Sequence, residues 1–173
     1  MLFFRQGILR NPPLASRFFL DVAAIHAIMR SMRIQAGSSG PICGGHMEEL
    51  LMKVKNDPYA GLLGISIDRL EKGYALCSIT VTEKMLNFLG LLHGGLIFSL
   101  ADVAFSAASN SDHEPSCALD VSGSFFRSAD PGDTITAEAR LIHTTRRTGV
   151  YRMDVKKNGE LMATFNGTVF RRI

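Results

Sequence analysis

One acidic side chain stands alone in the most apolar stretch of the sequence, between Gly94 and Asn110. Asp102 is the only ionisable residue there, and most of its neighbours are leucine, isoleucine, phenylalanine, valine or alanine. An ionised carboxylate among apolar side chains without partners is strongly unfavourable, so we expect a raised pKa or a local polar environment. This arrangement favours a general base or nucleophile in a dry cleft. The alternative is a structural aspartate bound to backbone amides or to a neighbouring subunit.

A polar stripe runs through the same stretch if it is helical. Successive residues of a helix are rotated by about 100°, so four polar side chains fall within one stripe about 80° wide. They are Ser99, Asp102, Ser106 and Ser109. The rest of the stretch is apolar nearly all round, which predicts that the helix is buried.

The tripeptide His93-Gly94-Gly95 begins the same stretch. The first amides of a helix have no acceptor within it and carry the positive end of its dipole. Glycines there let a ligand carbonyl approach the backbone closely, and the loss of one such donor typically costs about 3 kcal/mol of transition-state stabilisation. The pattern predicts an oxyanion site. For His93, orienting the loop backbone is favoured over acting as a general base, because no acid lies nearby in the sequence to form a relay.

Alternating apolar and polar residues indicate the elements that position this helix. A short helix is expected over Glu48–Asn56, ended by Asp57-Pro58. Six strands are expected over Leu62–Leu70, Gly73–Thr82, Cys117–Arg127, Asp133–Thr144, Gly149–Lys156 and Leu161–Arg171. The Asn158-Gly159 pair before the last strand is a strong hairpin signal. Six strands interrupted by one long apolar helix predict an α+β fold, with a curved six-stranded antiparallel sheet wrapped around one central helix.

The composition narrows the class of protein. A length of 173 residues suits one domain, and a hydrophobic content of 46% excludes a wholly disordered chain. No stretch approaches the roughly 18–20 apolar residues of a membrane span, so no membrane partner is expected. The three cysteines (Cys43, Cys77 and Cys117) and five histidines lack metal-ligand spacing. We therefore expect no metal, no cofactor and a reducing, cytoplasmic compartment.

The first 46 residues differ from the rest of the chain. They hold five arginines and one acidic residue, whereas the remainder is close to neutral, which argues against a nucleic-acid-binding surface. A cluster of helix and strand breakers over residues 36–41 precedes Met47. We expect residues 1–46 to be an over-extended start or a leader added by cloning, and the folded domain to be residues 47–173. An organellar targeting segment and a genuine additional element are the alternatives.

Several motifs occur in an order and at spacings that resemble one family. They are Met85-Leu86-Asn87, His93-Gly94-Gly95 followed by Asp102, Phe125-Phe126-Arg127, Gly132-Asp133-Thr134 and Thr148-Gly149-Val150-Tyr151. On these motifs, about residues 57–172 resemble the PaaI-type (phenylacetic-acid-degradation) hotdog-fold acyl-CoA thioesterases. The resemblance implies a hotdog fold, active sites at a homodimer interface, common assembly into a homotetramer, and hydrolysis of acyl-CoA without metal or redox cofactor. It leaves residues 1–46 unmatched, which favours Met47 as the natural start.

The resemblance also implies roles for individual residues. Asp102 matches the catalytic carboxylate of the family, and Gly94 matches the residue whose amide polarises the thioester carbonyl. Asn87 matches the loop amide that helps to hold the same oxygen. In the family the carboxylate faces the asparagine and glycine of the other subunit, so a single chain would hold only half-sites.

The sequence departs from the family on the strand after the helix. Some relatives place a hydroxyl residue there to orient the attacking water, and this sequence has Ala118 at that position. Either a nearby serine, Ser122 or Ser124, substitutes for it, or the contact is absent. Asp120 lies on the same strand, and inward and outward orientations of its side chain are equally expected.

Further candidate contacts to a substrate are weaker. Gly95 and Ser124 are candidates for binding the CoA or acyl part of the substrate. Three arginines are candidates to pair with the phosphates of CoA: Arg127, Arg146 and Arg147. The acyl pocket should be apolar, and the residues that could line it, or equally belong to the core, are Met85, Leu86, Leu89 and Phe98.

The resemblance, together with these residues, implies an enzyme that hydrolyses a thioester. The expected substrate is (hydroxy)phenylacetyl-CoA or a related aryl or medium-chain acyl-CoA, and the products are the free acid and CoA. One alternative is a non-catalytic acyl-CoA-binding hotdog protein, which could dispense with Asp102. The other is a hotdog dehydratase, whose acid–base pair fits Gly94-Gly95 poorly. Whether Asp102 acts as nucleophile or as general base stays open at this point.

Overall fold

The computed structural model describes residues 45–112 and 115–171. The expectation that residues 1–46 are a leader therefore concerns residues that lie outside this description, except for the last two. Helix α2 spans Gly45–Lys55, so the described chain enters its first helix two residues before Met47.

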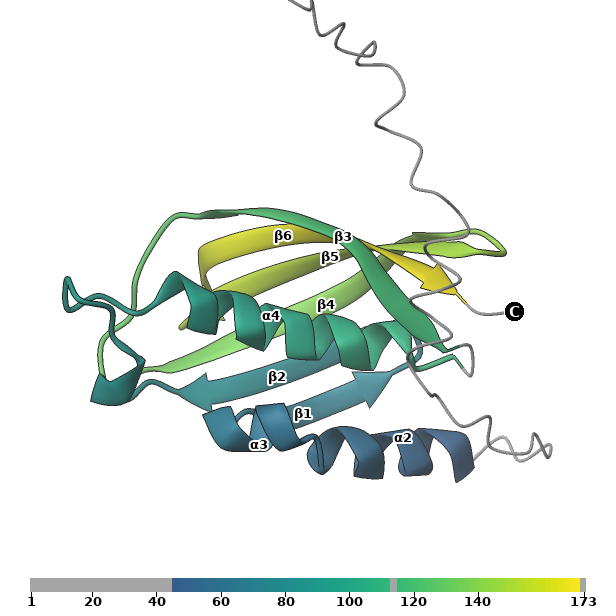
Figure 1. Ribbon diagram of the computed structural model, residues 1–173, viewed down its shortest axis with the longest axis horizontal. Coiled ribbons are helices and arrows are strands. Elements are labelled where there is room, and N and C mark those ends of the chain that lie inside the picture. Colours follow the sequence, from purple (N-terminus) through teal and green to yellow (C-terminus); the bar gives the residue numbers. More distant parts are fainter. Residues whose placement is uncertain (1–44, 113–114, 172–173) are drawn as a thin grey trace, which may run out of the picture. The chain divides into compact units, whose positions relative to one another are not determined.

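Three α-helices, one short 3-10 helix and six strands make up the described part of the chain, with the labels of Figure 1. The helices after α2 are α3 (Pro58–Leu63), the 3-10 helix η2 (Glu83–Met85) and α4 (Gly94–Ser109). The strands are β1 (Ser66–Glu71), β2 (Tyr74–Thr80), β3 (Ser116–Phe125), β4 (Thr134–Thr144), β5 (Thr148–Lys157) and β6 (Glu160–Arg171). Each of the six predicted strands corresponds to one of these.

Helix α3 corrects the start of the first predicted strand, which was expected to begin at Leu62. The Asp57 side chain accepts a hydrogen bond from the Ala60 N–H at 2.7 Å, and Pro58 follows at the first turn of the helix. Gly64, with a φ of 77°, closes the helix in the left-handed conformation. Capping therefore keeps Leu62 and Leu63 helical, and β1 begins only at Ser66.

All six strands form one antiparallel sheet in the order β1-β2-β4-β5-β6-β3. The hairpin from β5 to β6 turns at Asn158 and Gly159, whose φ angles of 51° and 80° are those that an Asn-Gly turn supplies. The sheet curves around α4, as Figure 1 shows. This is the predicted hotdog architecture, and the prediction is confirmed.

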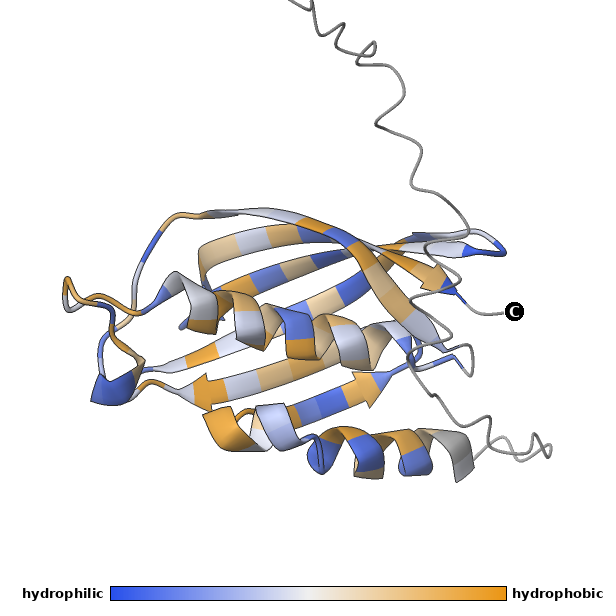
Figure 2. Cartoon of the chain, in the orientation of Figure 1, coloured by the Kyte–Doolittle hydropathy of each residue, from blue (hydrophilic) through white to orange (hydrophobic). Residues whose placement is uncertain are grey.

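The core lies between the inner face of the sheet and one side of α4. The helix packs mainly on β2, β4 and β5. Leu100 and Phe105 of α4 are fully buried there, together with Ile135 and Met153 of the sheet. A Cβ at Gly167 would lie 2.7 Å from the Phe105 ring, so the glycine lets the helix approach β6 closely. Hydrophobic and hydrophilic residues alternate along the strands in Figure 2, as expected for a sheet covered on one face.

The opposite side of α4 is left largely exposed by residues 45–112 and 115–171, which contradicts the prediction of a helix buried all round. Gly95, Phe98, Asp102 and Ser106 are exposed along one face, because the sheet covers only the other. Ser109, predicted to share this polar stripe, is instead buried with 3% of its surface exposed. Among these exposed residues only Phe98 has a large apolar side chain, so the face that the described chain leaves open includes Asp102 and Ser106 of the predicted polar stripe.

Strand β3 forms one edge of the sheet. It pairs with β6 on one side, and no other described strand pairs with its second side. It is ten residues long, and its last four residues are exposed. A long edge strand presents a row of unpaired backbone N–H and C=O groups, which other chains can pair with.

Candidate active site

In the first turn of α4, one backbone N–H group donates a hydrogen bond within the chain and one does not. His93 caps the helix, since its Nδ1 accepts a hydrogen bond from the Gly95 N–H at 2.8 Å. The N–H of Gly94 has no acceptor among residues 45–112 and 115–171. In the hydrogen bond with Gly95, Nδ1 is the acceptor, which leaves Nε2 as the other ring nitrogen of His93. This geometry agrees with an orienting role for His93 and leaves Gly94 as the free donor.

Asp102 lies two turns further along α4, on its exposed face. Its carboxylate has no hydrogen-bond or ion-pair partner in the described part of the chain. Surrounding protein atoms still displace part of its hydration, and this desolvation raises the pKa of Asp102. The residue is therefore exposed as a whole but less hydrated than a free carboxylate. The carboxylate is thus unpaired and more basic than an ordinary aspartate.

Two serines on the exposed face of α4 flank Asp102. Ser99 Oγ donates to the carbonyl oxygen of Gly95 at 2.8 Å, whereas Ser106 Oγ has no partner within the described residues. The hydroxyl of the buried Ser109 donates instead to the Ser106 carbonyl oxygen at 3.2 Å. Gly95, Ser99 and Asp102 therefore occupy three consecutive turns of one face.

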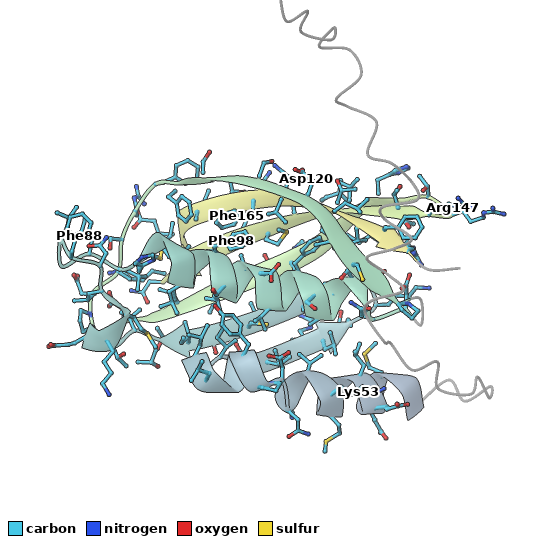
Figure 3. The ribbon with its side chains drawn as sticks, in the orientation of Figure 1. Lys53, Phe88, Phe98, Asp120, Arg147 and Phe165 are labelled. Atoms are coloured by element: carbon cyan, nitrogen blue, oxygen red, sulfur yellow. The ribbon has the colours of Figure 1, made fainter. Side chains whose placement is uncertain are left out.

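The loop before α4 presents Asn87. Its Oδ1 accepts hydrogen bonds from the N–H groups of Leu89 at 2.8 Å and Leu91 at 3.2 Å. Because only an oxygen can accept from two amides, the Nδ2 group of Asn87 is left as a donor. The His93 N–H donates to the Met85 carbonyl at 2.9 Å, which holds the start of the loop beside the start of α4. Figure 3 marks Phe88, at the tip of this loop.

A pocket of about 480 Å³ opens beside the first turn of α4, between α3, η2 and α4. It is lined by Tyr59, Leu63, Lys84, Met85, Leu86, His93, Gly95, Leu96, Phe98 and Ser99. Three of the four residues suggested for an acyl pocket are among them. The fourth, Leu89, is not, and 67% of its surface is exposed.

Four wall residues of the pocket were not predicted from the sequence: Lys84, Leu96, Tyr59 and Leu63. Tyr59 and Leu63 come from α3, a helix that was not predicted either. The signal that could have found them is Asp57-Pro58, because an N-cap residue followed by proline predicts the start of a helix.

The register of β3 turns its polar residues away from α4. Ser122 and Ser124 pair with Asn166 and Thr164 of β6, and Asp120 pairs with Thr168. Paired residues share a face, and these β6 residues alternate with Phe165, Gly167 and Val169, which face the core. Figure 3 shows Asp120 on the side of the strand away from the helix.

Ala118 pairs with Val169 and so faces inward. Of the two explanations for the missing hydroxyl, substitution by a nearby serine is therefore not supported. Within one chain, Ser124 lies on the face of the sheet away from α4, so its expected contact with the substrate is likewise not supported.

The candidate phosphate-binding arginines are exposed, and Arg146 and Arg147 lie apart from the start of α4. Arg127 forms an ion pair with Glu160. Arg146 and Arg147 lie in the turn between β4 and β5, and Figure 3 places Arg147 at the opposite end of the described chain from Phe88. One chain therefore does not bring Arg146 or Arg147 to the start of α4.

Metal-dependent catalysis and a cysteine nucleophile find less support in the described residues. Residues 45–112 and 115–171 contain no group of three or more histidine, cysteine or acidic side chains that could hold a metal ion. Burial raises the pKa of the Cys77 thiol to about 12, so it is a poor nucleophile. No helix in the described chain is long and apolar enough to cross a membrane.

Comparison with known proteins places these features in context. The profile of the thioesterase superfamily matches residues 89–163. The chain is 40% identical to the acyl-coenzyme A thioesterase PaaI of Escherichia coli over 118 residues, which cover 68% of this chain and 84% of that protein. It is 39% identical to a putative esterase of Archaeoglobus fulgidus over 118 residues, covering 68% and 77%.

Solved structures agree with the sequence comparisons. The structure of the E. coli PaaI protein superposes with a TM-score of 0.68 and 34% identity, covering 73% of this chain and 96% of that one. The structure of a mutant form of the phenylacetic acid degradation protein PaaI from Thermus thermophilus gives a TM-score of 0.65 and 38% identity, covering 67% and 100%.

Proposed function

This chain belongs to the PaaI-type hotdog thioesterases of the thioesterase superfamily, and from that premise we propose how and on what it acts. It is a thioester hydrolase, and its proposed substrate is (hydroxy)phenylacetyl-CoA or a related aryl or medium-chain acyl-CoA. The observation that carries the proposal is the free N–H of Gly94, at the positive end of α4 and beside an apolar pocket. Such an amide is placed to bind the oxygen of a thioester carbonyl.

The proposed site is completed by a second copy of the chain. Gly94 and Asp102 are eight residues apart on one helix, which separates them by about 12 Å along its axis. The reacting carbonyl group must lie within about 3 Å of both its oxyanion donor and the group that attacks or activates water. Gly94 and Asp102 of the same chain cannot both meet this condition, so Asp102 would act on a thioester held by the other protomer.

Strand β3 supplies the surface on which the two copies would meet. Its free edge can pair with the same edge of a copy, and a twofold axis makes such pairing antiparallel. Opposite ends of the two chains then lie near one another. Arg146 and Arg147 of one protomer would approach the α4 start of the other, within reach of the phosphates of a CoA bound there. We propose a homodimer as the functional unit, and further pairing of dimers would give the expected homotetramer.

The proposed mechanism uses groups of the protein alone. The Gly94 N–H and Asn87 Nδ2 donate to the thioester oxygen as negative charge develops on it. In one route, Asp102 takes a proton from a water molecule, the water oxygen bonds to the carbonyl carbon, and the carbon–sulfur bond breaks to release CoA thiolate. In the other, a carboxylate oxygen of Asp102 attacks the carbonyl carbon and expels the thiolate, and water then hydrolyses the anhydride. Single-turnover hydrolysis in oxygen-18 water distinguishes them, since only the second route places the label in Asp102.

The pocket supports an apolar acyl group. Leu63, Met85, Leu86, Leu96 and Phe98 contribute apolar wall beside the free amide. An aryl ring or a medium-length alkyl chain would bury its surface against them once the carbonyl oxygen is bound by Gly94.

The test is a thiol-release assay with a panel of acyl-CoAs, including phenylacetyl-CoA, its ring-hydroxylated forms and straight chains of increasing length. We expect steady release of CoA with the highest kcat/KM for one of the aryl or medium-chain substrates. Binding of these acyl-CoAs without any release would instead indicate a non-catalytic acyl-CoA-binding protein. Formation of an unsaturated acyl-CoA from a 3-hydroxyacyl-CoA would indicate a dehydratase.

A further inference from the structure

The hydroxyl group of Tyr59 connects α3 to α4 beside the pocket. It lies 2.9 Å from Ser99 Oγ, across 40 residues of sequence. Ser99 has one hydroxyl proton, and its Oγ donates to the Gly95 carbonyl oxygen at 2.8 Å. The proton between the two hydroxyls therefore comes from Tyr59. A chain of two hydrogen bonds thus links α3 to the turn that carries the free Gly94 amide.

This link fixes the Tyr59 ring as part of the pocket wall. Tyr59 lines the pocket, although 53% of its surface is exposed in the single chain. Leu63, one turn further along α3, is the only other residue of this helix in the lining. Because its proton is committed to Ser99, Tyr59 offers a bound acyl group a ring surface rather than a hydrogen-bond donor.

The position of Ser99 determines where the ring meets a bound substrate. Ser99 lies four residues after Gly95, about 6 Å further along the helix axis. An acyl chain that starts at the Gly94 amide and runs along the exposed face of α4 would reach Tyr59 after one turn of the helix. It must then stop or bend into the space bounded by Leu63 and Met85.

We propose, on the basis of the proposed function, that Tyr59 is a specificity-determining residue that limits the length of the acyl group. Its ring, held in place by Ser99, closes the path along α4 and directs the acyl group into the pocket. Acyl chains that fit within one helical turn of the carbonyl, or that bend into the pocket, are accepted. Longer straight chains meet the ring and are disfavoured.

The experiment compares kcat/KM for straight-chain acyl-CoAs from butyryl to palmitoyl in full-length wild-type protein and in four variants. Tyr59→Ala removes the ring, while Tyr59→Phe and Ser99→Ala keep it and remove its hydrogen bond. Leu62→Ala is the matched control, because Leu62 lies on the same helix but is 79% exposed and outside the pocket lining.

For Tyr59→Ala we expect the ratio of kcat/KM for the longest to the shortest substrates to rise by about tenfold or more, since steric exclusion in an apolar pocket is worth about that much. Tyr59→Phe and Ser99→Ala should raise the same ratio by a smaller factor, because the ring is then free to move aside. Leu62→Ala should leave the ratio unchanged.

Two outcomes overturn the inference. One is a length profile of Tyr59→Ala that matches wild type, and the other is an equal shift in Leu62→Ala. Should Tyr59→Ala fail to fold, an unchanged profile in both Tyr59→Phe and Ser99→Ala overturns it equally. Failure of the proposed function is distinguishable, because in that case wild type itself releases no CoA from any substrate.

Discussion

The two glycine amides at the start of α4 differ in what they can still bind. The Gly95 N–H is held by His93 at 2.8 Å, whereas the Gly94 N–H has no acceptor in the described chain. The histidine thus selects which amide is offered to a ligand. The side chain of Asn87 is restricted in the same way. Its Oδ1 accepts hydrogen bonds from two loop N–H groups, so its Nδ2 is left as the donor for a ligand.

Asp102→Asn should lose activity without losing the fold. An amide side chain neither accepts the proton of water nor attacks a carbonyl carbon, so kcat should fall by at least about 100-fold. The side chain is exposed and unpartnered in the described chain, so circular dichroism should be unchanged. Asp130→Asn, at an exposed aspartate in the turn after β3, is the matched control and should keep full activity. Near-normal thiol release by Asp102→Asn would refute the assignment.

The raised pKa of Asp102 predicts a pH-dependent stability difference. Desolvation raises this pKa in the folded chain, so ionised Asp102 destabilises the folded state at pH values above the usual range of an aspartate. Below that range the group is protonated in both states and contributes nothing. The Tm of Asp102→Asn should therefore exceed that of wild type near pH 7, and the gap should close near pH 3. A gap that widens on acidification would contradict the sign of the shift.

A site residue could be predicted from the sequence when its immediate neighbours in the chain mark it out. Asp102 and Gly94 are recognisable because the one lies alone in an apolar helix and the other begins it. The orientation of Ser124 could not be predicted in this way. The alternation of inward and outward side chains along β3 is interrupted by a register shift between Ala118 and Asp120. A bulge of this kind depends on pairing with β6, which no short stretch of sequence encodes.

At the scale of elements, α4 depends on the cap that His93 provides. His93→Ala removes the acceptor of the Gly95 N–H and should lower the free energy of unfolding by about 1 kcal/mol, the usual cost of a lost N-cap. His93→Asn, which replaces one capping acceptor by another, should recover most of this loss. Urea denaturation of the two variants measures the difference. Equal destabilisation in both would indicate that capping is not the function of the side chain.

The strands and α4 were predictable from residue alternation, but the surroundings of α4 were not. Its apolar content suggested burial all round, yet Phe98 and Asp102 share an exposed face. The periodicity of a sequence indicates how apolar each face of a helix is, but it does not indicate which partner covers that face. The apolar content of α4 therefore does not distinguish burial in the core of one chain from burial against the proposed second copy.

At the scale of the whole molecule, the division of the site between two protomers is testable by mixing inactive variants. Asp102→Asn and Asn87→Ala each damage a different half of the proposed site. Refolding an equal mixture should give heterodimers in which one of the two sites is intact, and activity should return to about a quarter of wild type. Each variant refolded alone is the control and should stay inactive. No recovery from the mixture would mean that Asp102 and Asn87 act within the same chain.

The open edge of β3 has a consequence for newly synthesised chains. Before any assembly, each chain carries an edge strand whose outer side pairs with no other described strand, and the edge of such a strand can recruit an extended segment. Asp120 is the only charged residue on that strand, and it points away from the helix. We expect the charge of Asp120 to oppose pairing of this edge with unrelated segments. We expect substitution of Asp120 to lower the yield of correctly assembled enzyme during overproduction more than it lowers kcat.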